Sequence, residues 1–184
     1  ISLDVTTIAE AMSMAQAAVR AGVDWLEAGT PLILGEGLHA VSALRKEFPN
    51  VPVVAGIKGM DGGGLEAKMM MDAGANMVVV MGQAHDATII EAVKAAKRQG
   101  GQIMVDVMLC PDKPGRARQA QDMGADIITV HTGYDERRMI TGLSPLDDLQ
   151  SVLDAVTIPV QAVGGLSVEQ ALETLDMGAQ IVVF

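Results

Sequence analysis

The chain has 184 residues, 49% of them hydrophobic, and carries a formal charge of -10. A chain of this length is expected to fold as one domain with a substantial core. The 13 basic residues are outnumbered by 23 acidic ones, which excludes a broad surface that tracks nucleic-acid phosphates. One Trp, one Tyr and two Phe are too few for base-stacking platforms.

Cysteine content and hydropathy exclude two further classes. The single cysteine, Cys110, rules out an internal disulfide and fits a reducing compartment. No apolar run approaches the roughly 20 residues of a membrane span, and the chain opens without a basic-then-apolar leader. We therefore expect a cytoplasmic protein that binds neither membranes nor nucleic acids.

A repeated motif organises the chain. A small residue, a glycine, a second small residue, a polar residue and an apolar run follow one another four times, with the glycines at Gly22, Gly74, Gly124 and Gly178. The copies are roughly 50 residues apart, a spacing that indicates a repeated structural unit. Each glycine is placed to end a helix, and each apolar run that follows is typical of a strand buried on both faces.

Four more strands and seven helices complete the predicted pattern. In chain order, the additional strands are predicted at residues 1–5, 52–57, 102–108 and 159–163. Apolar periodicity predicts helices at 8–21, 37–48, 65–73, 88–99, 115–123, 146–155 and 168–177. Strict alternation of strand and helix implies parallel strands joined by right-handed crossovers.

Eight such strands predict an α/β fold of the (β/α)8 type, a TIM barrel. A doubly wound open sheet is the rival, but it usually has fewer strands and an early Gly-x-Gly-x-x-Gly fingerprint, which this chain lacks. We expect residues 1–184 to form a single barrel domain. Because the sequence stops at Phe184 inside the eighth predicted strand, we expect a truncated barrel without its last helix, as part of a longer chain.

Polar residues stand where the apolar strands end. They are Asp4, Glu27, Lys58, Asp61, Asp106, His131, Thr132, Gly133, Gly164 and Gly165. Active sites of such barrels lie at the carboxyl ends of the strands. Several charges gathered there favour an active site over a structural ion network, because a buried charge is costly unless it is paired or bound to metal.

Gly164-Gly165 lies between the seventh strand and a helix whose first polar residue is Ser167. Exposed backbone N–H groups at the start of a helix bind anions, and barrels often hold phosphate after strands seven and eight. A tight turn would need the same two glycines. The position favours a phosphorylated small molecule as ligand.

Three motifs carry a resemblance to a known family. They are Leu26-Glu27-Ala28-Gly29-Thr30-Pro31-Leu32-Ile33, Lys58-x-x-Asp61 and Val130-His131-Thr132-Gly133. They resemble the 3-hexulose-6-phosphate synthase family of the orotidine 5'-monophosphate decarboxylase suprafamily, which also holds 3-keto-L-gulonate-6-phosphate decarboxylase. The likeness runs over the whole chain, and the first motif favours the synthase and gulonate branch over orotidine decarboxylase.

The resemblance implies a (β/α)8 homodimer that uses Mg2+ and adds formaldehyde to D-ribulose 5-phosphate through an enediolate. Glu27 would then be a metal ligand, Lys58 would stabilise or protonate the enediolate, and His131 would handle protons. Asp61 would reach into the neighbouring subunit's site. The substrate contacts would come from Asp4, Asp106, Thr132 and Gly133, with Gly164 and Gly165 at the phosphate.

One departure from the family pattern concerns the third strand. The family has Asp-x-Lys-x-x-Asp there, and this chain has Gly56-Ile57-Lys58-Gly59-Met60-Asp61. Gly56 removes a hard oxygen ligand of the kind that Mg2+ favours. Three explanations stay open: an altered reaction, a weakened or inactive homologue, and a substitution made deliberately. Asp4 or Asp106 is a candidate to replace the acid in part.

Two alternatives to the synthase remain. The first is a 3-keto-L-gulonate-6-phosphate decarboxylase, although that branch has Arg three residues after the histidine, where this chain has Tyr134. The second is a non-catalytic sugar-phosphate-binding barrel, which fits the missing acid. Some barrels of the synthase type are fused to other domains, so a fused domain outside this chain is also expected.

Overall fold

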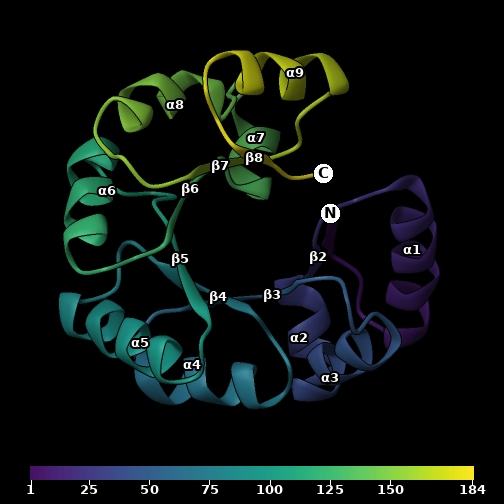
Figure 1. The fold of residues 1–184 in the computed structure, drawn as a ribbon. Helices are drawn as coiled ribbons and strands as arrows, with labels where there is room; N and C mark the ends of the chain where they lie inside the picture. Colours follow the sequence, from purple (N-terminus) through teal and green to yellow (C-terminus); the bar gives the residue numbers. More distant parts are fainter.

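The computed structural model describes residues 1–184 and contains eight parallel strands in one sheet, ordered β1 to β8 as in the chain. The strands are β1 Ser2–Leu3, β2 Leu26–Ala28, β3 Val53–Gly59, β4 Met77–Met81, β5 Gln102–Asp106, β6 Ile127–His131, β7 Val160–Val163 and β8 Ile181–Val182. They curl into a ring that brings the two termini together (Figure 1). The N–H of Ser2 donates to the carbonyl of Phe184 at 2.9 Å across the junction.

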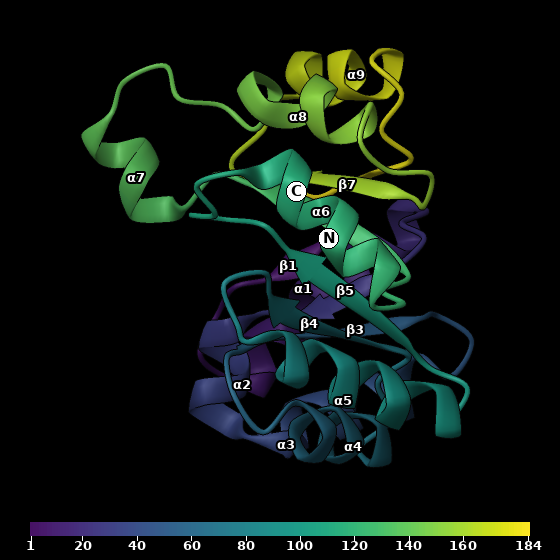
Figure 2. The same cartoon turned by 90° about the vertical axis from the view of Figure 1, so that its left-hand side faces the viewer.

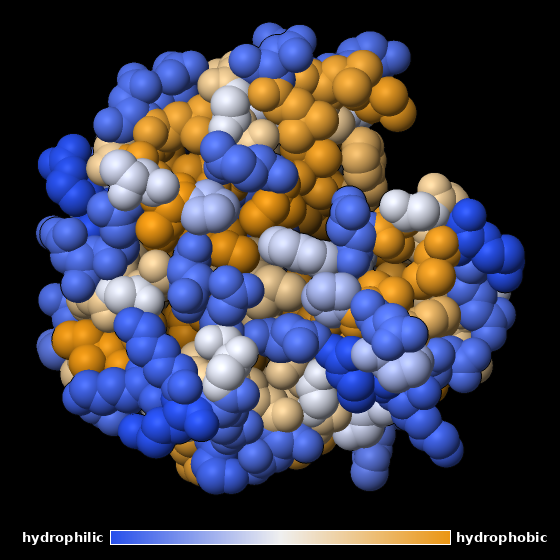
Figure 3. Space-filling view, viewed as in Figure 1, coloured by the Kyte–Doolittle hydropathy of each residue, from blue (hydrophilic) through white to orange (hydrophobic).

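The structure has nine helices, which lie around the outside of this ring except for α7, which stands beyond the carboxyl ends of the strands (Figures 1 and 2). They are α1 Ile8–Ala21, α2 Thr30–Glu36, α3 Leu38–Glu47, α4 Gly63–Asp72, α5 Asp86–Arg98, α6 Lys113–Asp122, α7 Tyr134–Met139, α8 Leu146–Leu153 and α9 Val168–Asp176. The predicted (β/α)8 barrel is confirmed. No helix follows β8 within these residues, and Figure 3 shows a notch in the outer ring between α9 and α1.

Burial explains why these segments form a barrel. All five residues of β4 are buried, as expected for a strand covered on both faces. Alternate positions of the strands divide between two clusters. One cluster of 40 buried residues joins the strands to the helices, and a cluster of five, Val54, Met77, Val79, Met104 and Ile127, fills the interior of the ring.

The repeated glycines have the conformation that the sequence predicts. Gly22, Gly74, Gly124 and Gly178 have φ values of 92°, 113°, 96° and 111°. Each follows the end of a helix, where a left-handed residue lets the chain turn toward the next strand. The Gly22 N–H donates to the carbonyl of Val19 at the end of α1.

Two helices, α2 and α7, are absent from the seven that the sequence predicts. The helix α2 holds seven residues with a proline and a glycine among them, and α7 holds six mostly polar residues. Segments this short have too few turns to show an apolar periodicity. Both follow a strand directly, so they lie at the carboxyl end of the barrel.

No helix of the structure has the length and apolar character to span a membrane.

Candidate active site

A cavity of about 1210 Å³ opens at the carboxyl ends of the strands, and we call this opening the mouth. Eight of the ten residues predicted to form the site line it: Asp4, Glu27, Lys58, Asp106, His131, Gly133, Gly164 and Gly165. The strand ends place them together although they are distant in sequence. The helix α7 stands out beyond the same ends (Figure 2).

Two predicted residues lie elsewhere. Thr132 is buried and does not line the cavity, and its backbone lies close against Gly164. Asp61 is exposed on the loop after β3, and its carboxylate accepts a hydrogen bond from the Gly62 N–H at 2.8 Å. Neither side chain faces this mouth.

The motif around Glu27 is built by close contacts. A Cβ at Gly29 would collide with the Asp4 carboxylate and lie 2.9 Å from the Leu3 carbonyl, so only glycine fits beside β1. The hydroxyl of Thr30, at the start of α2, donates to the Gly56 carbonyl at 2.5 Å. This bond fixes the end of β2 against the end of β3.

Lys58 is held by an unusual backbone conformation. It is a non-glycine residue with positive φ, 54°, and it lies where the pairing of β3 with β4 shifts register between Ala55 and Gly59. A left-handed L-residue costs about 1–2 kcal/mol, and such strain is concentrated at functional sites. Lys58 lines the cavity and forms no ion pair there.

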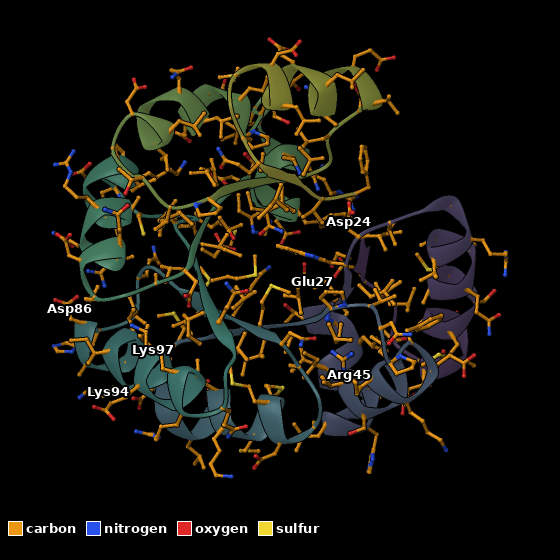
Figure 4. The ribbon with its side chains drawn as sticks, in the orientation of Figure 1. Asp24, Glu27, Arg45, Asp86, Lys94 and Lys97 are labelled. Carbon is orange, nitrogen blue, oxygen red and sulfur yellow. The ribbon has the colours of Figure 1, made fainter.

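Glu27 points into the ring from β2 (Figure 4). Burial raises the pKa of its carboxyl to about 7, and the negative charges of Asp4 and Asp106 add to the rise, while Lys58 opposes it. Protein atoms therefore replace the water that would stabilise its charge. Near neutral pH this carboxyl divides between its protonated and ionised forms.

Gly56 is the neighbour that gives Glu27 its space. A Cβ at Gly56 would collide with Oε1 of Glu27 and lie 3.2 Å from the Ala28 carbonyl. The Glu27 carboxylate thus occupies the volume that a side chain at position 56 would fill. Compared with the family pattern, Gly56 removes a negative charge from the mouth. It also leaves space that the Glu27 carboxylate fills.

His131 is oriented by a buried carboxylate. Its Nδ1 lies 2.7 Å from Oδ2 of Asp106, whose other oxygen accepts the Met108 N–H at 2.9 Å. Asp106 is 1% exposed. With Asp106 ionised, Nδ1 carries the hydrogen and Nε2 remains as the proton acceptor. The contact with Asp106 therefore fixes one tautomer of the His131 imidazole.

Two features of the mouth are not among the residues predicted from sequence. Thr129 and Gln161, inside β6 and β7, form a buried hydrogen bond of 2.7 Å below the strand ends. The helix α7 contributes five residues to the cavity wall: Tyr134, Asp135, Glu136, Arg137 and Met139. Polar residues at inward positions of apolar strands are the signal that could have found the first feature. The second gives no such signal, because its charged residues are typical of an exposed loop.

The acidic side chains of the mouth do not form a complete metal site. No three or more His, Cys, Asp or Glu side chains are grouped closely enough to hold a metal ion by themselves. Mg2+, however, commonly takes one or two carboxylates and fills its remaining positions with water and substrate oxygens. Glu27 and Asp4 both line the cavity, and this donor set fits an ion completed by the substrate.

Fold and site together define a (β/α)8 barrel with charged side chains gathered around a cavity at the carboxyl ends of its strands. The sequence matches the Orotidine 5'-phosphate decarboxylase / HUMPS family over residues 1–180, and the chain belongs to that family.

Three known proteins illustrate the relationship. The 3-hexulose-6-phosphate synthase of Bacillus subtilis (strain 168) is 34% identical over 184 residues, which cover 100% of this chain and 86% of the relative. The crystal structure of the 3-hexulose-6-phosphate synthase from Salmonella typhimurium is 36% identical, with a TM-score of 0.93 over 98% of this chain and 85% of that one. KGPDC from Streptococcus mutans, solved in complex with a phosphorylated sugar, is 26% identical, with a TM-score of 0.88 over 100% and 85%.

The positive φ of Lys58 predicts that, at this position, a glycine variant is more stable than an alanine variant. Lys58→Gly should have a higher free energy of unfolding than Lys58→Ala, by roughly 0.5–1 kcal/mol, because glycine accepts positive φ at little cost. At Lys94, exposed on the helix α5, glycine should instead be the less stable by about 1 kcal/mol. Urea unfolding measures both pairs, and the same order at both positions would contradict the strain.

The pKa of Glu27 predicts a pH dependence of stability in metal-free buffer. The native pKa lies above the unfolded one, so the native state binds more protons and the free energy of unfolding should fall as pH rises from about 4.5 to about 7. The fall should be on the order of 3 kcal/mol at most.

Glu27→Gln should remove that part of the slope, because a glutamine cannot titrate. The exposed residue Glu47 supplies the control, since Glu47→Gln should keep the slope of the parent protein. Chemical unfolding at several pH values tests this, and an unchanged slope in Glu27→Gln would refute the assignment.

Proposed function

We propose that this protein is a lyase of the 3-hexulose-6-phosphate synthase type, which joins formaldehyde to D-ribulose 5-phosphate. The observation that carries the proposal is the convergence of Glu27, Lys58 and the His131–Asp106 pair on one cavity. Likeness to curated synthases over nearly the whole chain supports it. The phosphorylated sugar bound in the related KGPDC structure supports a ligand of the same kind here.

In the proposed reaction, His131 acts as the base. Nε2 removes a proton from C1 of ribulose 5-phosphate, and the electron pair moves to the C2 oxygen to give the enediolate. C1 then attacks the formaldehyde carbon, a carbon–carbon bond forms, and the formaldehyde oxygen takes up a proton. No atom is lost, and the product is a six-carbon ketose phosphate.

Lys58 and Asp106 have supporting roles in this scheme. The positive charge of Lys58, which lines the cavity, stabilises the negative charge that develops on the enediolate oxygens. Asp106 holds the His131 tautomer and stabilises the imidazolium that forms. We therefore add this positioning role to the substrate contact predicted for Asp106.

We propose Mg2+ as the resident ion, held by Glu27 with Asp4 as the second carboxylate. A bound divalent ion supplies Lewis-acid stabilisation of negative oxygen. Asp4 is the better replacement for the missing acid, because both oxygens of Asp106 already accept hydrogen bonds. We also propose a homodimer, in which Asp61 outside its own mouth serves the neighbouring site.

The decisive experiment measures loss of ribulose 5-phosphate with and without formaldehyde, in the presence of Mg2+. We expect consumption that depends on formaldehyde. Absence of turnover in both the parent protein and Gly56→Asp, under conditions that sustain a known synthase, would refute the proposal. Carbon dioxide release from 3-keto-L-gulonate 6-phosphate would identify the decarboxylase instead, and metal-independent binding without either reaction would identify a non-catalytic barrel.

Asp106→Asn tests the base. Its amide would present N–H to Nδ1 of His131 while its oxygen keeps the Met108 N–H, and the histidine would then adopt the wrong tautomer. We expect kcat to fall by roughly 100-fold or more. The control is Asp126→Asn at the opposite end of the barrel, where the residue accepts the Ile103 N–H. Equal activity of the two variants would exclude the pair as the base.

Gly56→Asp tests the missing acid. The new side chain must displace the Glu27 carboxylate and adds a second negative charge beside it. Without divalent ions we expect the free energy of unfolding to fall by roughly 1–3 kcal/mol. Mg2+ should restore it and should bind more tightly than to the parent protein.

Gly56→Asn is the matched control, because it has the same shape without the charge. It should lose stability through the collision but gain nothing from Mg2+. Thermal unfolding and calorimetric titration with MgCl2 provide the measurements. Identical Mg2+ responses of the Asp and Asn variants would show that position 56 is not beside a cation site.

A further inference from the structure

The helix α7 carries an arginine that no role described so far uses. Arg137 comes from the segment after β6, lines the mouth, and is partly buried, whereas its neighbour Arg138 is exposed. The helix stands beyond the strand ends (Figure 2). Arg137 is therefore a second cation at the mouth, besides Lys58.

The guanidinium of Arg137 lies directly against the Gly164-Gly165 turn. A Cβ at Gly165 would collide with Nη1 and would lie 2.5 Å from Cζ and 3.1 Å from Nη2. Gly165 has φ of 66°. The guanidinium thus occupies the space that a side chain at position 165 would fill, and it packs directly on the turn.

The guanidinium has no anionic partner within the protein. Arg137 forms no ion pair, and its buried Nε has no hydrogen-bond acceptor. A buried donor without a partner costs about 1–3 kcal/mol. Cζ of Arg137 lies over the Tyr134 ring, 5.9 Å from its centroid, at the distance of a cation–π contact.

The backbone of the adjacent turn also has hydrogen-bond donors without partners. The N–H groups of Gly164, Gly165 and Leu166 make no hydrogen bond within the protein. Three donors of a turn and a planar guanidinium beside them match the oxygens of a phosphate, which arginine binds in a bidentate manner. All these groups lie at the end of β7 or against it.

We propose that Arg137 is the cationic phosphate-binding residue of this site and completes the Gly164–Leu166 turn. The inference deepens the proposed function and rests on it for the identity of the sugar. In a ring of eight strands in chain order, β7 lies opposite β3. Arg137 therefore holds the phosphate at one wall, and the reacting carbons extend toward Lys58 at the other.

Charge explains why this arginine matters in an acidic protein. The chain has a net charge of -10, and five carboxylates line the same mouth: Asp4, Glu27, Asp106, Asp135 and Glu136. A phosphate dianion is repelled by those carboxylates and attracted by Arg137. The sugar phosphate is consequently oriented as well as bound.

The test compares Arg137→Gln with Arg138→Gln by calorimetric titration with ribulose 5-phosphate and, separately, with inorganic phosphate. Arg138 is the matched control, since it lies on the same helix and donates to the Tyr134 hydroxyl at 3.0 Å. Arg137→Gln should weaken ribulose 5-phosphate binding roughly 10- to 100-fold, and Arg138→Gln should change it less than twofold. Arg137→Lys should recover part of the loss, and its folding can be checked by circular dichroism.

Inorganic phosphate separates charge recognition from a structural role. It should compete for the same site and lose affinity in Arg137→Gln, because it contacts only the phosphate end of the mouth. Equal affinities of Arg137→Gln and Arg138→Gln, or no binding of either probe to the parent protein, would overturn the proposal. Normal phosphate binding through Arg137 without formaldehyde-dependent turnover would leave it standing and refute the synthase assignment alone.

Discussion

Parallel pairing of each strand with its neighbour in the chain is the constraint on which the whole site depends. Because all eight strands run in one direction around the ring, every strand ends on the same side, and residues distant in sequence share one opening. Glu27, Lys58 and His131 come from β2, β3 and β6. These three residues are far from one another in sequence, so the ladder of backbone hydrogen bonds is what sets their relative positions.

The cavity wall carries more carboxylates than cations, and this excess of negative charge determines the electrostatics of the mouth. Glu27 responds to this field, since burial together with Asp4 and Asp106 raises its pKa to about 7. Asp106 is itself satisfied by His131 and the Met108 amide. Gly56 relaxes the crowding, because its missing side chain leaves the space that the Glu27 carboxylate occupies. The departure from the family pattern is thus accommodated by its neighbour and does not leave an empty position.

Much of this arrangement can be predicted from sequence, for reasons that particular residues make clear. The repeated glycines at 22, 74, 124 and 178 mark helix ends through their backbone freedom, and the polar residues after apolar strands mark the mouth. The short helices α2 and α7 are not predictable, because six or seven residues contain too few turns to show a period. Arg137 escapes prediction with α7, since only the fold shows that it packs on Gly165. Thr132 is expected among the contacts because it follows His131, but alternation along the chain turns it behind the wall.

The left-handed backbone of Lys58 has one more consequence. A side chain steered by a salt link swings away when salt, pH or a ligand disturbs its partner, but Lys58 has no such partner. The register shift of β3 sets only where its side chain leaves the backbone, and the ammonium group ends a flexible four-carbon stem. The charge of Lys58 therefore carries no internal neutralisation, and it is available to any anion that enters the mouth.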